Sequence, residues 1–399
     1  MRSLHIGLRL GRRTALVALV SAAVTLTAGV PVSATDAQAA GHPGVRGSVL
    51  SVRSLTGQQA LPGASRNLLV TYVSKGVAGR AVKVTGTVAL PKGRPPAGGW
   101  PVISWAHGTT GTADVCAPSR NTPGGPADDY ISIANTTLDG WVTNGFAVVQ
   151  TDYEGLGTPG EHPYMNGAGA ADTVIDMVRA ARRVDPRVGG DWFAAGHSQG
   201  GHASLFTAVA QSAGDVRLRG VVSIAPGGWG MSQVAPYILS GAPGAEQAIA
   251  FLPTLLIGAA AADKAVKPDR LLTPEAAPLL TTARTGCLAQ IRETAARIPV
   301  DKVFARGADL APLTAYLKSQ EPVGLEVKVP VLVAQGTTDT LTPKASTDRI
   351  VADLCAKAPK VTYRVYDGVD HRGAIAASFD DALTFVRLIR SGRTPVTTC

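Results

Sequence analysis

Apolar and polar residues alternate along two segments in the first quarter of the chain, residues 67–74 and 81–90. Successive side chains of a strand point to opposite faces, so this alternation predicts antiparallel edge strands, each with one buried face. Later runs are apolar throughout and rich in Val, Ile and Ala, which is typical of strands buried on both faces. These predicted buried strands are 101–106, 145–151, 192–195, 220–225, 329–334 and 361–366.

Helical patterns separate several of these strands, at residues 168–183, 200–211, 344–356 and 379–390. Strands that alternate with helices predict an α/β fold with a mostly parallel sheet and helices on both faces. Ligands of such sheets bind at the carboxyl ends of the strands. The loops that follow the predicted strands are therefore the candidates for chemistry.

The alternation stops between residues 228 and 328, where no strand pattern is found. We expect this segment to form a mainly helical cap between two core parts, 40–227 and 329–399. Its most apolar stretch, 248–262, contains Pro253 and is too short to span a membrane. This stretch fits either a buried core helix or a helix that lines an acyl tunnel or contacts lipid.

The first 39 residues follow the order of a signal peptide. Four arginines precede an uncharged run over 14–35, and small residues offer cleavage sites at 32–34 and 37–39. Pro31 and these small residues close the run, which disfavours a permanent membrane anchor. We expect a secreted chain with no integral span after cleavage, exported by the Sec route or, given Arg12 and Arg13, by the twin-arginine route.

Charge and cysteine usage narrow the function further. Loss of residues 1–39, with four Arg and one Asp, lowers the formal charge from +9 to +6. No dense Lys/Arg run with interleaved aromatics occurs, so a nucleic-acid partner is not expected.

The chain has four cysteines without CxxC spacing, which are Cys116, Cys287, Cys355 and Cys399. In an exported chain such cysteines favour disulfides over metal ligation. Spacing alone leaves all three pairings open.

The pentapeptide Gly196-His197-Ser198-Gln199-Gly200 lies between a predicted strand and a predicted helix. G-x-S-x-G at such a turn exposes a serine nucleophile and directs the next backbone N–H, that of Gln199, at the same space. The chain contains 45 Gly, so the pattern can also arise by chance. Its catalytic interpretation therefore depends on a base and an acid at the same sheet edge.

Both partners are found after later strands, in the order Ser, Asp, His. His371 follows strand 361–366, and Asp339 is the one acidic residue of the loop 335–343. Asp370 is a rival acid, but adjacent side chains rarely aim at one point. For His107, His197 and His202 we expect roles in packing or loop shape.

The loop 107–111 follows strand 101–106 and is rich in glycine, so its backbone can approach a ligand. We expect a second oxyanion donor from this loop, with Thr109 or Thr110 able to add a hydroxyl, besides the Gln199 N–H. The segment 155–160 fits GxGxxG, but Pro159 prevents the helix start that a dinucleotide needs. We expect no cofactor and no metal.

Several blocks make the chain similar to the secretory lipase family, the lipase A type of α/β-hydrolases. They are the segments 115–119 (Val-Cys-Ala-Pro-Ser), 145–157 (with Asp-Tyr-Glu-Gly), 196–200 and 225–228 (Ala-Pro-Gly-Gly). The resemblance implies an α/β-hydrolase fold, a triad of Ser198, Asp339 and His371, and disulfides Cys116–Cys287 and Cys355–Cys399. It also implies a secreted enzyme that acts on acylglycerols or other carboxylic esters. Lipid contact through the cap is a separate expectation, from the apolar stretch 248–262.

The chain departs from the better-known fungal members around the serine and the oxyanion loop. Those members have Tyr and Gly where this chain has His197 and Gln199, and an acidic residue where it has Thr110. A secreted peptidase or acyltransferase uses the same triad, and a non-catalytic lipid-binding protein can keep the fold. The sequence also leaves open whether long or short acyl chains are preferred.

Overall fold

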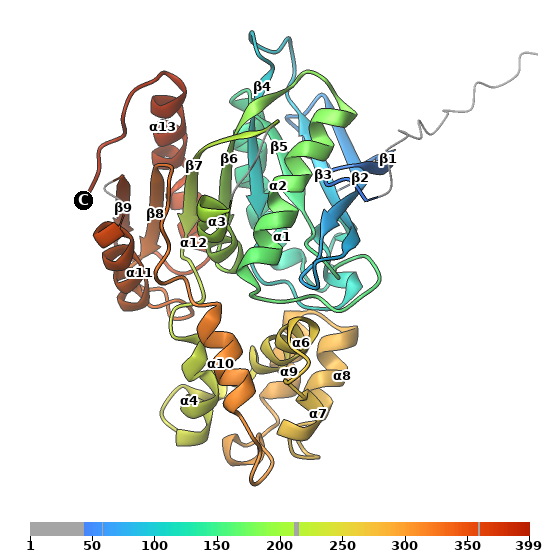
Figure 1. The fold of residues 1–399 in the computed structure, drawn as a ribbon, viewed down its shortest axis with the longest axis vertical. Coiled ribbons are helices and arrows are strands. Elements are labelled where there is room, and N and C mark those ends of the chain that lie inside the picture. The colour runs from blue at the N-terminus through green and yellow to red at the C-terminus, as the bar shows by residue number, and fades with distance from the viewer. Residues whose placement is uncertain (1–43, 58, 211–214, 358–359) are drawn as a thin grey trace, which may run out of the picture. The chain divides into compact units, whose positions relative to one another are not determined.

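The computed structural model describes residues 44–57, 59–210, 215–357 and 360–399. The predicted signal peptide 1–39 and the end of the predicted helix 200–211 lie outside them. The described part contains a nine-stranded sheet in the order β1-β2-β3-β5-β4-β6-β7-β8-β9 (Figure 1). The chain therefore has the α/β fold that its alternating pattern predicts.

One side of the sheet is antiparallel. β2 (Arg66–Lys75) pairs along its whole length with β3 (Ala81–Leu90), and β3 continues onto β5. Both match the segments in which apolar and polar residues alternate, but neither is the predicted edge strand, because β2 also pairs with β1 and β3 with β5. The outermost strand of this side, β1 (Val49–Ser54), is not predicted, because its six half-exposed residues carry too short a pattern.

The other strands run parallel to one another, from β5 to β9. They are β4 (Trp100–Ala106), β5 (Ala147–Thr151), β6 (Val188–His197), β7 (Arg217–Ile224), β8 (Val331–Gly336) and β9 (Val361–Tyr366). Every residue of β4, β5 and β8 is buried, which explains their continuous apolar sequences. β9 is half exposed because it forms the far edge.

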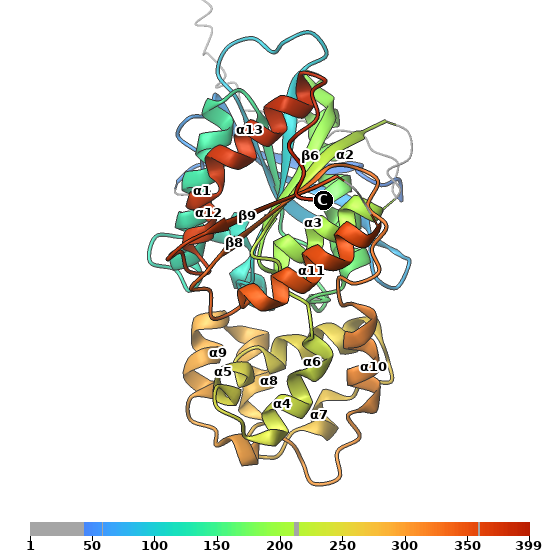
Figure 2. The same ribbon diagram turned by 90° about the vertical axis from the view of Figure 1, so that its left-hand side faces the viewer.

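Helices cover both faces of the sheet (Figure 2). α2 (Gly167–Val184), α3 (Gln199–Val209) and α11 (Lys344–Lys357) lie on one face. α1 (Asp128–Thr143), α12 (Gly373–Ala377) and α13 (Phe379–Arg390) lie on the other. α1 and α12 are not predicted. α1 contains β-branched residues and Gly140, which are weak helix formers, and its packing overrides this preference.

A helical insertion occupies the chain between β7 and β8, at the carboxyl ends of the parallel strands (Figures 1 and 2). Its helices are α4 (Val234–Ser240), α5 (Ala245–Ile249), α6 (Leu252–Ala262), α7 (Pro268–Leu271), α8 (Pro278–Thr285), α9 (Leu288–Ala295) and α10 (Ala311–Ser319). They enclose a hydrophobic cluster of their own, in which Leu252 and Leu256 are fully buried. α6 is thus the core helix of the insertion.

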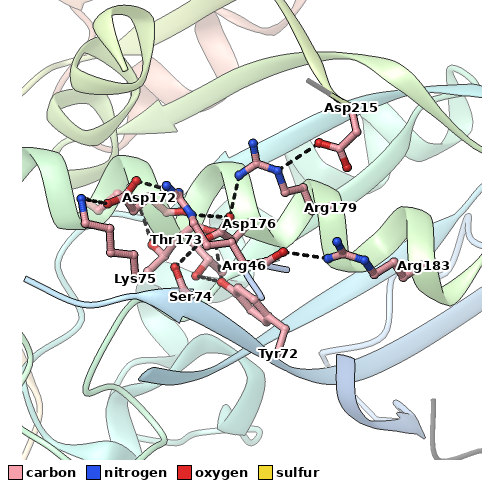
Figure 3. A network of polar contacts seen from close by, with 12 residues as sticks. Arg46, Tyr72, Ser74, Lys75, Asp172, Thr173, Asp176, Arg179, Arg183 and Asp215 are labelled. Atoms are coloured by element: carbon pink, nitrogen blue, oxygen red, sulfur yellow. Dashed lines mark hydrogen bonds and ion pairs between the residues drawn. The ribbon is translucent and has the colours of Figure 1, made fainter. Parts of the chain in front are cut away.

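A buried ionic network joins the start of the described chain to α2 (Figure 3). The Asp176 side chain is fully buried and accepts hydrogen bonds from Arg46, Arg179 and Ser74 at 2.7–3.0 Å. Each charge meets an opposite charge, so burial of the carboxylate is compensated. The segment before β1 is held against the sheet in this way.

Two disulfides link distant parts of the chain, Cys116 with Cys287 and Cys355 with Cys399. They are the pairs that the resemblance implies. The first joins the segment after β4 to the residue that precedes α9, and the second joins α11 to the C-terminus. Among the helices that the structure describes, none is long and apolar enough to cross a membrane.

Candidate active site

Ser198 occupies the sharp turn between β6 and α3. Its backbone angles are φ 60° and ψ −115°, in a region that residues other than glycine rarely adopt. The Ser198 N–H donates to the Ile224 carbonyl at 2.9 Å, and the Ser198 carbonyl accepts from the N–H groups of His202 and Gly227. The neighbouring strand and helix therefore hold this strained conformation in place.

The glycines on either side of this turn are required by close backbone contacts. A Cβ atom at position 196 would lie 2.3 Å from the Gly200 carbonyl oxygen. At position 200 it would lie 1.8 Å from the Ala106 carbonyl oxygen. No side chain fits at either place, so the two glycines allow β6, α3 and the end of β4 to meet beneath Ser198.

Asp339 and His371 form a buried pair at the ends of β8 and β9. His371 Nδ1 lies 2.8 Å from Asp339 Oδ2. The carboxylate also accepts from the Leu341 and Thr342 N–H groups, the Thr342 hydroxyl and the Gln335 amide. Burial alone would raise the pKa of Asp339, but His371 and the Thr342 bonds outweigh it and lower that pKa to about 2. Asp339 is thus an anion at neutral pH.

His197 supports the backbone of His371. Its Nε2 lies 2.8 Å from the His371 carbonyl oxygen, and the two rings are 4.5 Å apart. Burial lowers the pKa of His197 to about 3, so its ring is neutral and donates through Nε2–H. Its other nitrogen faces the Tyr130 hydroxyl at 3.4 Å.

Ser198 and His371 line one cavity of about 570 Å³ beneath the helical insertion. Among the described residues, no hydrogen bond joins the Ser198 hydroxyl to His371. The other walls are mostly apolar and include Met231, Val234, Ala248, Phe251 and Leu255. The stretch 248–262 therefore supplies both the core of the insertion and part of this wall.

Of the three predicted oxyanion residues, one lines the cavity and two do not. Gln199 lines the cavity, and its backbone N–H lies in the first turn of α3, where no intrahelical partner exists. Thr109 and Thr110 are not among the residues that line the cavity. The Thr109 hydroxyl is 2.7 Å from the Tyr164 hydroxyl, whereas the buried Thr110 hydroxyl has no hydrogen-bond partner among the described residues.

Four supporting side chains are missing from the sequence-based site. Gln335, Thr342 and His197 hold Asp339 or His371, and His162 binds the Gln199 side-chain amide at 2.9 Å. The spacing of Asp339 and Thr342 is typical of a turn in which the aspartate caps the next N–H groups, and this was the one local signal. Gln335 and Asp339 are also close in sequence, whereas the contacts of His197 and His162 join segments far apart in the chain.

No cluster of three or more His, Cys, Asp or Glu side chains suited to a metal ion occurs in the described ranges. The possible ligands His371 and Asp339 already bind each other. The site thus consists of a strained serine, a histidine–carboxylate pair and a mainly apolar cavity.

A mostly parallel sheet with a serine at the strand-to-helix turn, Asp and His after later strands, and a helical insertion above them define an α/β-hydrolase. The family model described as serine aminopeptidase, S33, matches residues 127–373. The chain belongs to this family of α/β-hydrolases.

Solved structures show the same fold at low sequence identity. Candida antarctica lipase A has a TM-score of 0.73 and 20% identity, with 89% of this chain and 84% of that chain covered. The rice cell wall degrading esterase LipA from Xanthomonas oryzae has a TM-score of 0.66 and 20% identity, with 88% and 100% covered. A putative hydrolase from Legionella pneumophila has a TM-score of 0.67 and 18% identity, with 86% and 98% covered. No curated protein matches the chain in sequence.

Proposed function

We propose that the protein is a secreted serine carboxylic-ester hydrolase, a lipase that acts on acylglycerols through an acyl-enzyme. The observation that carries the proposal is the buried Asp339–His371 pair, whose histidine lines the same apolar cavity as a serine held at φ 60°. A strained serine beside a histidine–carboxylate pair suits nucleophilic acyl transfer. An apolar cavity suits an acyl chain.

In the proposed reaction, His371 acts first as a base and then as an acid. Its Nδ1 is bound to the Asp339 anion, so the proton stays on Nδ1 and leaves Nε2 free. Nε2 takes the Ser198 proton as the oxygen attacks the ester carbonyl, and gives it to the departing alcohol. Water then attacks the acyl-enzyme in the same way and regenerates Ser198.

The oxyanion of each tetrahedral intermediate needs at least two donors. We assign the Gln199 N–H as one, because it lines the cavity and lies next to Ser198. For the second we propose the 109–110 loop, where the Thr110 hydroxyl is buried without a partner among the described residues.

The segment 228–328 acts in this proposal as a cap over the core formed by 40–227 and 329–399. Ala248, Phe251 and Leu255 would contact the acyl chain. Contact with the lipid surface would come from three exposed side chains of this segment, Trp229, Tyr237 and Leu239. Exposed large apolar side chains are unfavourable in water, so lipid is a better environment for them.

Secretion follows from the predicted signal peptide 1–39 and fits the two disulfides, which form in oxidising compartments. The +6 charge of the processed chain would also favour an anionic lipid surface.

The nucleophile is tested with Ser198→Ala. We expect kcat for ester hydrolysis to fall by about six orders of magnitude, as loss of a triad serine does elsewhere. Labelling by a fluorophosphonate probe should disappear as well. Ser204→Ala, a buried serine of α3 outside the cavity, is the matched control and should keep both properties. Full activity of Ser198→Ala, or labelling at another residue, would refute the assignment.

The lipase assignment is tested by rates on glycerol esters of increasing acyl length, below and above the concentration at which each substrate aggregates. We expect kcat/KM to rise with chain length until the apolar cavity is filled. We also expect activity to persist on aggregated substrate. A preference for soluble acetate esters with no turnover of long chains would refute the lipase while leaving the ester hydrolase intact.

A peptidase is the second candidate, because the matched family model carries the description of a serine aminopeptidase. The triad alone does not choose between ester and amide substrates. Matched aryl esters and anilides with the same acyl group distinguish the two. If the acyl group is an amino-terminal residue and its anilide is cleaved faster than its aryl ester, the peptidase is favoured.

A further inference from the structure

His371 also lines a second cavity, of about 650 Å³. The two cavities share five residues, which are Gln247, Phe251, Thr340, Leu341 and His371, whereas Ser198 and Gln199 line only the first. The triad histidine therefore lines two spaces, one mostly apolar and one lined partly by charged side chains.

Four ionisable side chains besides His371 line this second cavity: Glu246, Arg292, Asp370 and Arg372. Arg372 pairs with Asp129 at 2.8 Å, and Asp370 accepts from the Gly373 N–H at 2.7 Å. Glu246 is exposed, so water can solvate its charge. Arg292 is the half-buried charge of this set that has no direct partner among the described residues, although Asp129 lies near enough to favour its charged form.

Arg292 lies on α9 and is half buried, with its guanidinium 5.8 Å from the centre of the Phe251 ring. Within the described residues this guanidinium makes no ion pair and no hydrogen bond. Burial and the like charge of Arg372 lower the pKa of Arg292, and they outweigh the opposite effect of the Asp129 carboxylate. A half-buried guanidinium with five N–H donors is a ready partner for a phosphate or carboxylate.

The proposed chemistry indicates which half of a substrate would enter this space. The leaving alcohol receives its proton from His371, so the alcohol must lie beside His371 during acylation. The acyl carbon must lie at Ser198, which lines the apolar cavity. The alcohol half is thus directed toward the second cavity.

We propose that the second cavity binds the alcohol half of the substrate and that Arg292 selects esters whose alcohol carries an anionic group, a phosphate or a carboxylate. This inference rests on the ester hydrolase function proposed above. It adds a specificity that the triad and the apolar cavity do not supply.

The test compares hydrolysis of esters with the same six-carbon acyl chain on three alcohols: glycerol, glycerol 3-phosphate and glyceric acid. For the unaltered protein we expect kcat/KM to be at least about tenfold higher for one or both anionic esters, as a charged hydrogen bond would give. The phosphate and carboxylate arms show which anion is favoured.

Arg292→Gln should abolish that preference, measured as the ratio of kcat/KM between the anionic and the neutral ester of the same variant, and Arg292→Lys should retain part of it. Arg297→Gln is the matched control, since it removes an exposed positive charge near the end of α9 that does not line the cavity. Equal kcat/KM for neutral and anionic esters, or equal losses in Arg292→Gln and Arg297→Gln, would overturn the inference. Turnover of the neutral ester in that case would leave the proposed function standing, whereas no turnover of any ester would refute the function itself.

Discussion

His197 and Ser198 are neighbours in the chain, yet they affect the site by different routes. Ser198 lines the cavity, whereas the His197 ring donates to the backbone of His371 from behind. His197 is therefore a positioning residue in the proposed mechanism. It would set where the His371 ring lies without contacting the substrate.

His197→Phe should lower kcat by up to about 100-fold, the loss expected when a catalytic group moves by about 1 Å. KM should stay nearly unchanged, because His197 does not line either cavity. His197→Gln, whose amide can donate to the same carbonyl, should restore part of kcat. Steady-state kinetics of the two variants provide the measurement. A change confined to KM, or an equal loss of kcat in the two variants, would exclude the positioning role.

Among single residues, the sequence predicts the candidate catalytic residues that follow strands, but it misses the side chains that hold those residues in place. Ser198, Asp339 and His371 each follow an apolar strand, so the parallel topology predicts one shared edge. The contact of Gln335 with Asp339 depends on how the loop after β8 folds back on that strand, and the contact of His162 with Gln199 depends on packing of a loop against α3. No periodic pattern encodes such contacts.

The secondary-structure elements show where periodicity suffices. β3 and β9 begin and end at the predicted residues, because fully paired strands with regular apolar positions give a clear signal. β1 is short and half exposed, and α1 is built from weak helix formers, so both depend on tertiary packing. The bounds of the insertion helices are equally hard to predict, since several span only four to eight residues.

The two disulfides join different pairs of elements, so their loss should have different effects. Replacing Cys355 and Cys399 by Ser should lower the free energy of unfolding by about 2–4 kcal/mol and leave kcat/KM nearly unchanged. Replacing Cys116 and Cys287 should cost similar stability and also lower kcat/KM, because Cys116 follows the 107–111 loop. Urea unfolding and ester kinetics on both double variants measure this. Equal kcat/KM in the two would contradict the expected difference.

Across the whole molecule, buried neutral histidines should make stability depend on pH. His107, His162, His197 and His202 are at most 2% exposed. Burial lowers the pKa of His107 and His202 to about 4, and that of His162 and His197 to about 3. In the unfolded chain these groups titrate near pH 6.5.

Because the unfolded chain binds more protons below this value, the free energy of unfolding should fall as pH decreases from about 6.5 toward 4. Each histidine should add a slope approaching about 1.4 kcal/mol per pH unit. Below about pH 4, protonation of Asp339 should add to the loss, since its folded pKa is about 2. Urea unfolding at pH values of about 7.5, 6.0 and 4.5 measures the effect. A free energy of unfolding that is constant across this range would contradict it.

The Cys116–Cys287 bond has a mechanical consequence for the helical insertion. The chain enters the insertion after β7 and leaves it at β8. With these two connections alone, the insertion could rotate about the line that joins them. The bond adds a third attachment before α9, where Leu288 N–H also donates to the Thr110 carbonyl at 2.8 Å. Three separate anchor points remove that hinge axis. We therefore predict that substrate of the proposed hydrolase enters by movement of parts of the insertion away from this bond, such as α4, rather than by rotation of the insertion as one piece.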